Sequence, residues 1–198
     1  MLQSNGSDSA LPIPTPSKEE CQKYQQFSDE HYKKQGKAVE KVFAQYPKND
    51  NIEEILIKTA ILNDFYSTAI KATYSVAEVI FNLKIDPELE KNDVTIVNKI
   101  ADATKNRENT NRREYVFSTK YCAIHKPQIF PIYDNLVARV LCYFGRKDNF
   151  FCFKNKDLRD YTQYVEIYHE FINFYGLKDF TLRQVDYYLW QLGKKYFK

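Results

Sequence analysis

The chain has 198 residues, with 29 Lys and Arg against 26 Asp and Glu, so that its net charge is only +3. Hydrophobic residues make up 43% of the sequence, which excludes wholesale disorder and is enough to bury the core of one domain. None of the five glycines lies between Lys37 and Phe144, which excludes the glycine-rich loops of P-loop and dinucleotide-binding proteins in that stretch.

Residues 1–16 are predicted to form a flexible arm, because they combine Ser, Asn and Gly with three prolines. Residues 17–198 are predicted to form a single helical domain. Its first helical segment begins at a capping box made by Ser17 and Glu20, breaks near Gly36 and then resumes.

The rest of the chain also shows helical periodicity, because apolar residues recur at spacings of three and four and no segment sustains the alternation of a strand. Helices are expected near residues 52–67, 72–83, 94–104, 114–126, 134–144, 158–175 and 182–196, with a further short one that starts at Asp86-Pro87. Gly145 is expected to stop the helix that begins at Asp134. The sequence therefore predicts an all-α, single-domain bundle of about eight or nine helices.

Metal and cofactor sites have little support, because the four cysteines form no C-x-x-C pair and no two histidines are spaced four apart on a helix. We expect no metal and no cofactor. The chain also lacks an apolar run of about 18 residues and a signal-like start, so we expect a cytoplasmic protein without a membrane segment. The oligomeric state stays open.

One segment, Phe117 to Leu141, combines residues that can carry chemistry: FSTKYCAIHKPQIFPIYDNLVARVL. It places Lys120 in a helix, then a loop that contains two prolines, and then Asp134 at the start of the next helix. Asp is a favoured N-cap residue, so Asp134 can be purely structural. The same position keeps a carboxylate ionised, and such a group can stabilise a cationic transition state. Both interpretations remain open.

The run PIYDNLVARVLCYF resembles the part of the helix-hairpin-helix DNA glycosylases in which a catalytic aspartate opens a helix reading D-x-x-V-x-R-V-L. The longer run STKYCAIHKPQIFPIYD is similar to a bacterial group with the 8-oxoguanine DNA glycosylase fold. This resemblance implies that fold, with Asp134 as the catalytic carboxylate and Lys120 at the place of the amine nucleophile.

The resemblance also implies a pocket for a base that is flipped out of the duplex. The run ILNDFYSTAI is loosely similar to the helix that opens the glycosylase core, which places Asn63 and Ser67 near the substrate. Tyr121 and Tyr133 are among the aromatic residues available for the pocket walls.

DNA is the partner that the resemblance implies, although the family's hairpin glycines are absent, so that a local basic patch and a different loop would have to hold it. The four-cysteine iron-sulfur loop of one branch is absent too, and no cluster is expected. The candidate contacts to nucleic acid are Lys105, Arg107, Arg112, Arg113 and Arg139.

The implied function is cleavage of the N-glycosidic bond of a damaged base, with Asp134 stabilising the sugar cation and Lys120 as the candidate nucleophile. The alternative is a catalytically inactive helical module that binds protein or nucleic acid, in which Asp134 is only a helix cap. The two hypotheses differ in geometry, because the first requires Lys120 and Asp134 to line one concave pocket with aromatic walls.

Overall fold

The computed structural model describes residues 13–26, 30–106 and 112–197. These residues form ten α-helices and two short 3₁₀ helices and contain no strand, so the all-α prediction is confirmed for this part of the chain. The helices are α1 (Lys18–Gln26), α2 (Glu30–Gln45), α3 (Ile52–Phe65), α4 (Thr73–Leu83), α5 (Asp86–Glu90), α6 (Thr95–Ala103), η1 (Thr104–Asn106), α7 (Tyr115–His125), α8 (Asn135–Asp148), η2 (Asn155–Arg159), α9 (Tyr161–Phe174) and α10 (Leu182–Tyr196).

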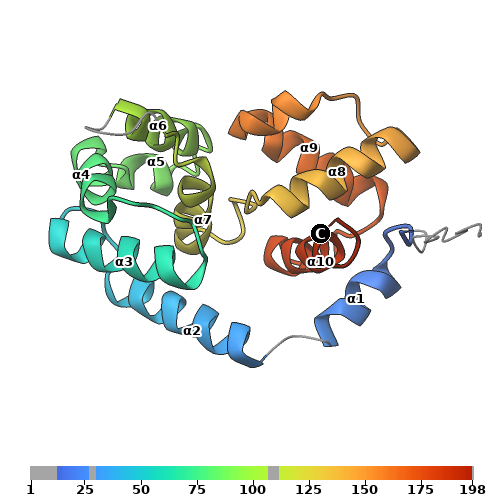
Figure 1. Ribbon diagram of the computed structural model, residues 1–198, viewed down its shortest axis with the longest axis horizontal. Helices are drawn as coiled ribbons and strands as arrows, with labels where there is room; N and C mark the ends of the chain where they lie inside the picture. The colour runs from blue at the N-terminus through green and yellow to red at the C-terminus, as the bar shows by residue number, and fades with distance from the viewer. Residues whose placement is uncertain (1–12, 27–29, 107–111, 198) are drawn as a thin grey trace, which may run out of the picture.

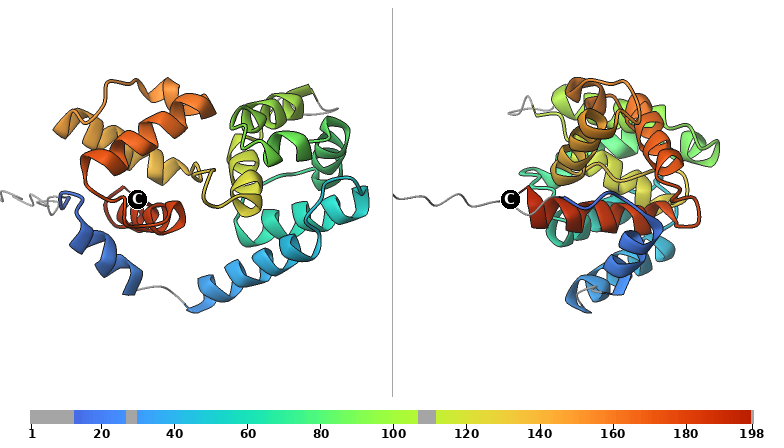
Figure 2. Two further views of the ribbon diagram at one scale, coloured as in Figure 1. Left: turned by 180° about the vertical axis from the view of Figure 1, so that it is seen from behind. Right: turned by 90° about the vertical axis from the view of Figure 1, so that its right-hand side faces the viewer.

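The helices gather into two lobes (Figures 1 and 2), one made of α2 to α7 and the other of α1 and α8 to α10. The first helix belongs with the last, because Gln25 Nε2 donates to Gln184 O at 2.9 Å and the ring of Tyr24 lies 5.4 Å from that of Tyr188. The chain therefore leaves one lobe after α1 and returns to it between α7 and α8.

Several helices begin at polar residues whose side chains cap them. Asn51 opens α3 by accepting a hydrogen bond from Glu54 N at 3.0 Å. Thr181 and Gln184 form a reciprocal capping box at the start of α10. Each such cap satisfies backbone N–H groups that have no partner within the helix, which fixes the residue at which the helix starts.

Both predicted helix breaks at glycine are wrong. Helix α2 continues through Gly36, and α8 continues through Gly145 to Asp148. A Cβ atom added to Gly145 would lie 2.8 Å from the Phe153 ring, so glycine serves close packing at this position. Helix α8 ends instead at Asn149, which adopts the left-handed conformation with φ 51°.

The predicted arm lies mostly outside the described residues, which begin at Ile13. Within its last four residues, Pro16 is buried and Ile13 packs against the core. Ser17 accepts from Glu20 N at 3.2 Å, as the capping box predicts. Packed chain therefore extends N-terminally of Ser17.

Buried tyrosines on α9 fix the loop that leads into α8. Tyr161 and Tyr164 are fully buried, and a buried phenol needs a hydrogen-bond acceptor. Tyr161 donates to Pro131 O at 2.8 Å, and Tyr164 donates to Ile132 O at 2.6 Å. Because these bonds hold Pro131 and Ile132, three and two positions before the α8 cap, they help to position Asp134.

The other lobe buries a lysine in its core. Lys58 Nζ donates to Tyr46 O at 2.9 Å, to Lys48 O at 2.6 Å and to Asn49 Oδ1 at 2.8 Å. The side chain of Asp86 in turn accepts from Asn49 N at 2.8 Å. Burial lowers the pKa of Lys58 to about 8, against the opposing effect of Asp86 and other carboxylates. This lysine ties the segment after α2 to α3.

Candidate active site

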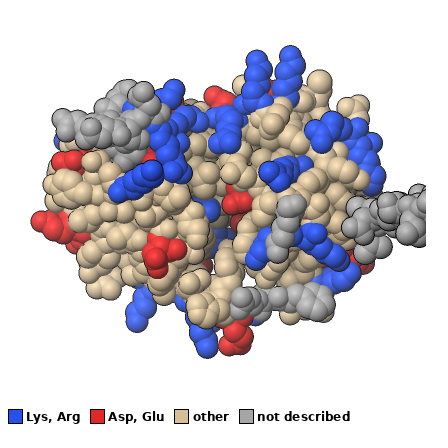
Figure 3. All heavy atoms as spheres, viewed as in Figure 1, with Lys and Arg blue, Asp and Glu red and all other residues tan. Residues whose placement is uncertain are grey.

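A cleft of about 410 Å³ lies between the two lobes. Figure 3 shows that the face seen in Figure 1 is hollowed between them, with acidic and basic side chains in the hollow. The cleft is lined by Tyr32, Phe65, Tyr66, Ser67, Thr68, Ala69, Arg112, Val116, Lys120, Ile132, Asp134, Asn135, Asp186 and Trp190.

Lys120 and Asp134 face each other in this cleft, with Nζ and Oδ2 3.9 Å apart. The Lys120 ammonium also donates to Tyr66 O at 3.0 Å, and its side chain is only 9% exposed. Burial lowers the pKa of Lys120, while the carboxylates of Asp134 and Asp186 raise it. The amine is thus largely desolvated and close to a carboxylate.

Asp134 serves as a helix cap and faces the cleft at the same time. Its Oδ1 atom accepts from Leu136 N at 2.8 Å, which leaves Oδ2 toward Lys120. The loop before it folds back on α7, because Tyr133 N donates to Thr119 Oγ1 at 3.2 Å. This bond connects the residue before Asp134 with the residue before Lys120, so the two predicted residues meet.

A second carboxylate, Asp186 on α10, was not among the candidate residues. It is 6% exposed, and Oδ1 has no hydrogen-bond partner among the described residues. Burial raises the pKa of Asp186 to about 7, against the opposing effects of Arg183 and Lys120. The sequence does carry a weak signal, because Asp186 lies four residues after Leu182 and three before Leu189, on the apolar face of the helix.

Aromatic side chains from both lobes wall the cleft. Tyr32 stacks on Trp190 with ring centroids 5.3 Å apart and an interplanar angle of 22°. The guanidinium of Arg183 lies 5.2 Å from the centre of the Tyr66 ring and donates to the Tyr66 hydroxyl. An aromatic wall of this kind suits a flat, unsaturated ligand.

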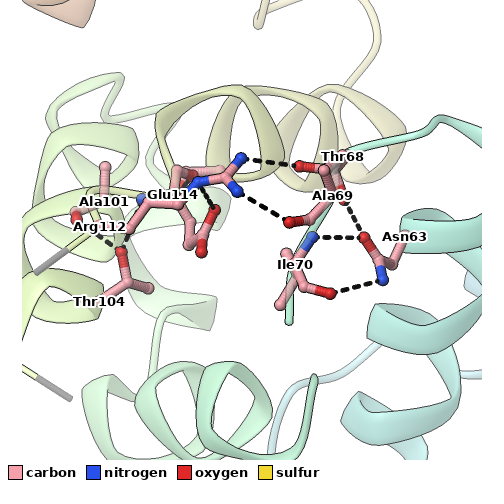
Figure 4. Close-up of polar contacts among 9 residues, drawn as sticks. Asn63, Thr68, Ala69, Ile70, Ala101, Thr104, Arg112 and Glu114 are labelled. Carbon is pink, nitrogen blue, oxygen red and sulfur yellow. Dashed lines mark hydrogen bonds and ion pairs between the residues drawn. The ribbon is translucent and has the colours of Figure 1, made fainter. Parts of the chain in front are cut away.

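Two residues predicted near the substrate have different roles. Ser67 lines the cleft, whereas Asn63 is not part of its lining and braces the turn between α3 and α4 (Figure 4). Its Oδ1 atom accepts from Ile70 N and from Thr68 Oγ1, both at 2.8 Å. The turn needs this support, because Ser67 and Ala69 have φ values of 49° and 58°, which are unfavourable for residues with a side chain.

The two tyrosines predicted for the pocket walls do not line the cleft. Tyr121 directly follows Lys120, so it points about 100° away around the helix. It is fully buried inside the lobe of α2 to α7, where its hydroxyl donates to Asn49 Oδ1 at 2.5 Å. Tyr133 is 2% exposed and lines a neighbouring pocket instead.

Arg112 lines the cleft, but its guanidinium braces the same turn as Asn63 (Figure 4). Nη1 donates to Ala69 O at 2.9 Å, and Nε lies 3.2 Å from a carboxylate oxygen of the buried Glu114. Arg112 therefore helps to hold the turn that lines the cleft, and the phosphate contact predicted for it stays a prediction.

The other predicted basic contacts are scattered. Arg113 is engaged within the protein, where it donates to Asp102 Oδ1 at 2.6 Å, and its contact to nucleic acid stays a prediction. Lys105 is exposed, and Arg139 is exposed on α8, away from the segment around residue 105. Arg107 lies outside the described residues.

Comparison with known proteins shows which family the chain belongs to. Residues 17–129 match the family model described as HI_0787_N: N-terminal domain. The chain belongs to the HI_0787_N family. An uncharacterised protein of Haemophilus influenzae is 39% identical over 147 residues, which make up 74% of this chain and 69% of that protein. No solved structure matches the chain.

The HI_0787_N match ends in the loop between α7 and α8. Lys120 therefore lies inside the matched N-terminal domain, while Asp134 and Asp186 lie beyond it. The cleft is built by both parts of the chain.

None of the helices in the described ranges has the length and apolar character needed to cross a bilayer. Those same ranges hold no group of three or more His, Cys, Asp or Glu side chains arranged to bind a metal ion.

Proposed function

We propose that this member of the HI_0787_N family is a DNA-glycosylase-like enzyme that cleaves the N-glycosidic bond of a damaged base. We further propose that its helices form a divergent version of the helix-hairpin-helix glycosylase fold. The observation that carries the proposal is the approach of Lys120 Nζ to Asp134 Oδ2, at 3.9 Å, inside a cleft with aromatic walls.

The cleft volume of about 410 Å³ lies within the range of small-molecule sites, so a flipped nucleotide can enter it. In the proposed reaction the Lys120 amine forms a bond to the sugar C1′ atom. The bond from C1′ to the base nitrogen breaks, and its electron pair leaves with the base, which takes up a proton. Asp134 stabilises the positive charge on the sugar, and sugar ring opening then gives a Schiff base with Lys120.

Proton transfer is the step in which Asp186 fits this scheme. The attacking amine must be neutral, and burial favours that form by lowering the pKa of Lys120. Asp186 has a pKa raised by burial to about 7, so its carboxylate can take up a proton near neutral pH. This buried acid therefore suits a general acid–base role beside the nucleophile.

Borohydride trapping on oligonucleotides that contain 8-oxoguanine or an abasic site tests the covalent step, because the reductant fixes a Schiff base as a stable adduct. Wild type should give the adduct and Lys120→Gln should not. Lys126→Gln, at the end of the same helix and outside the cleft lining, is the matched control and should trap as wild type does.

Direct assay of base release covers a mechanism in which water attacks. Asp134→Asn should reduce release about a hundredfold, because it removes the charge that faces the sugar. Absence of both adduct and base release from wild type on these substrates would favour the inactive binding module. That alternative is supported by the bond from Lys120 to Tyr66 O and by the capping bond of Asp134, since both can be purely structural.

A further inference from the structure

A second pocket, of about 390 Å³, lies beside the cleft on the lobe of α8 to α10. Asn135 lines both the pocket and the cleft, so the two cavities adjoin. Arg139 and Arg146 enter the pocket from α8, and Arg159 enters it from η2. The two arginines of α8 are seven positions apart, which is about two helical turns and places both on one face roughly 10 Å apart.

The pocket is strongly basic, because its lining contains these three arginines and no carboxylate. None of the three forms an ion pair with a carboxylate of the described residues, in contrast to Arg112, which pairs with Glu114, and Arg113, which pairs with Asp102. Lys and Arg side chains also gather over this lobe in Figure 3. Unneutralised guanidinium groups that converge on one cavity favour an anionic ligand.

Two of the guanidinium groups are already oriented by the protein. Arg159 lies 5.0 Å from the centre of the Tyr133 ring, and its Nη2 atom is 3.4 Å from Asn135 Oδ1. Arg139 Nη1 donates to Phe197 O at 2.7 Å. Each contact uses a fraction of the five N–H donors of an arginine, so the remaining donors can face a ligand, and their planar fork matches the oxygens of a phosphate.

We propose that this pocket binds backbone phosphates of a DNA strand, next to the nucleotide whose base enters the cleft. The placement of that nucleotide rests on the proposed glycosidase function. Phosphate binding at the pocket itself rests on the three arginines and the shared Asn135. This pocket takes the place of a glycine hairpin, whose backbone N–H groups this chain cannot offer to a phosphate over Lys37 to Phe144.

The test is fluorescence anisotropy with a labelled duplex that carries a non-cleavable abasic analogue, measured over a series of salt concentrations. The double variant Arg146→Gln with Arg159→Gln is compared with Lys41→Gln with Lys91→Gln. The second pair removes the same charge from exposed positions of the other lobe. Asp134→Asn is included as a variant of the proposed reaction centre that leaves the arginines intact.

We expect the arginine variant to bind at least about tenfold more weakly and to lower the slope of log K against log salt by about two, one unit for each lost phosphate contact. The lysine variant should bind as wild type does. Equal weakening in both variants, or no binding by wild type at low salt, would overturn the proposal. Competition by a free deoxynucleoside monophosphate as strong as that by the duplex would also overturn it, in favour of a small nucleotide.

Failure of the glycosylase function is distinguishable from failure of this proposal. If no lesion is processed but binding still depends on Arg146 and Arg159, the enzyme hypothesis falls and the phosphate pocket stands. If Asp134→Asn abolishes base release while binding is lost in neither variant, the reaction stands and the phosphate pocket falls.

Discussion

Among the residues that the structure describes, two helical lysines are buried, one inside a lobe and one at the cleft. Lys58 is fully buried and donates to three acceptors at 2.6 to 2.9 Å. The side chain of Lys120 is 9% exposed. Its ammonium donates to one backbone oxygen at 3.0 Å and lies 3.9 Å from Asp134 across a cleft. Burial lowers the pKa of both side chains, so a lowered pKa does not separate them. The difference is that all three N–H groups of the Lys58 ammonium have acceptors inside the protein, whereas the Lys120 ammonium faces a cavity.

The two lysines also differ in how firmly the segments that accept their hydrogen bonds are held. Asn49, which accepts from Lys58, is itself held by Asp86, whose Oδ1 lies 2.5 Å from Asn49 Nδ2. Tyr66, which accepts from Lys120, is followed by Ser67, whose φ is 49°. Both lie in the turn that Asn63 braces. Lys58 therefore donates to a segment that is itself held by hydrogen bonds, while Lys120 donates to a turn whose backbone is strained.

The largest effect is expected from Lys58→Met, which leaves three buried acceptors without a donor. The free energy of unfolding should fall by about 5 kcal/mol, because hydrogen bonds to a charged group are worth about 1.5 to 3 kcal/mol each. Urea denaturation measures the change. Lys120→Met is the matched control and should lose about 1 kcal/mol, since it leaves a single backbone acceptor that cleft water can reach. Equal losses would remove the distinction between the two lysines.

The next effect concerns Asp186. The folded chain keeps a proton on this side chain up to about pH 7, whereas a carboxyl with its usual pKa of 3.8 releases it earlier. The folded state therefore binds the extra proton between these values, so the contribution of Asp186 to stability falls as pH rises through this window. Asp186→Asn should remove the effect, and its free energy of unfolding minus that of wild type should rise by about 4 kcal/mol from pH 4 to pH 8.

Measuring the difference between Asp186→Asn and wild type is necessary because His125 works in the opposite direction. Burial lowers the pKa of His125 to about 3, so stability is lost as pH falls below its usual value of 6.5. Both proteins share this contribution, and it cancels in the subtraction. A difference that stays flat across the pH window would show that Asp186 is ionised in the fold.

A smaller effect is expected in the turn that carries Tyr66. Asn63→Ala should lower the free energy of unfolding by about 2 kcal/mol, because Ile70 N and Ile70 O lose their side-chain partner. Hydrogen exchange at Ile70 should accelerate. Thr68→Val removes a single hydrogen bond to the same amide and should cost less than half as much. An equal cost for both variants would mean that Asn63 does not brace the turn.

The smallest effect tests the strain itself. Ala69 has φ 58°, a conformation that costs a residue with a Cβ atom roughly 1 kcal/mol and glycine almost nothing. Ala69→Gly should therefore raise the free energy of unfolding by about 1 kcal/mol, which is measured as an increase in melting temperature. Ala60→Gly, at an exposed position inside α3, should lower stability by a similar amount. A loss of stability at both positions would show that the turn is not strained.

Local signals in the sequence were sufficient for most of the fold. Caps such as Asp134 and the periodicity of apolar residues predict where helices begin and what they bury. Glycine was the weak point, because Gly145 reflects the approach of the Phe153 ring, a contact that no local pattern shows. For the same reason the sequence does not reveal that Arg112 braces a turn some 40 residues away.

The candidate site divides along the same line. Lys120 and Asp134 were predictable because they occupy one continuous segment with a recognisable cap. Asp186 enters the cleft from the last helix, and Arg146 and Arg159 converge from two elements. Their meeting depends on the packing of α8, η2 and α10, which is a tertiary property.

The position of α1 has a consequence for how the HI_0787_N domain can be combined with other sequences. The matched segment, residues 17–129, includes α1, yet α1 packs on α10, which lies outside the match. The family unit and the spatial lobe are therefore interleaved, and the first helix of the one completes the core of the other. Any C-terminal segment that follows this N-terminal domain in a relative must offer α1 an equivalent docking surface. Exchange of the two parts between relatives should succeed only where that surface is preserved.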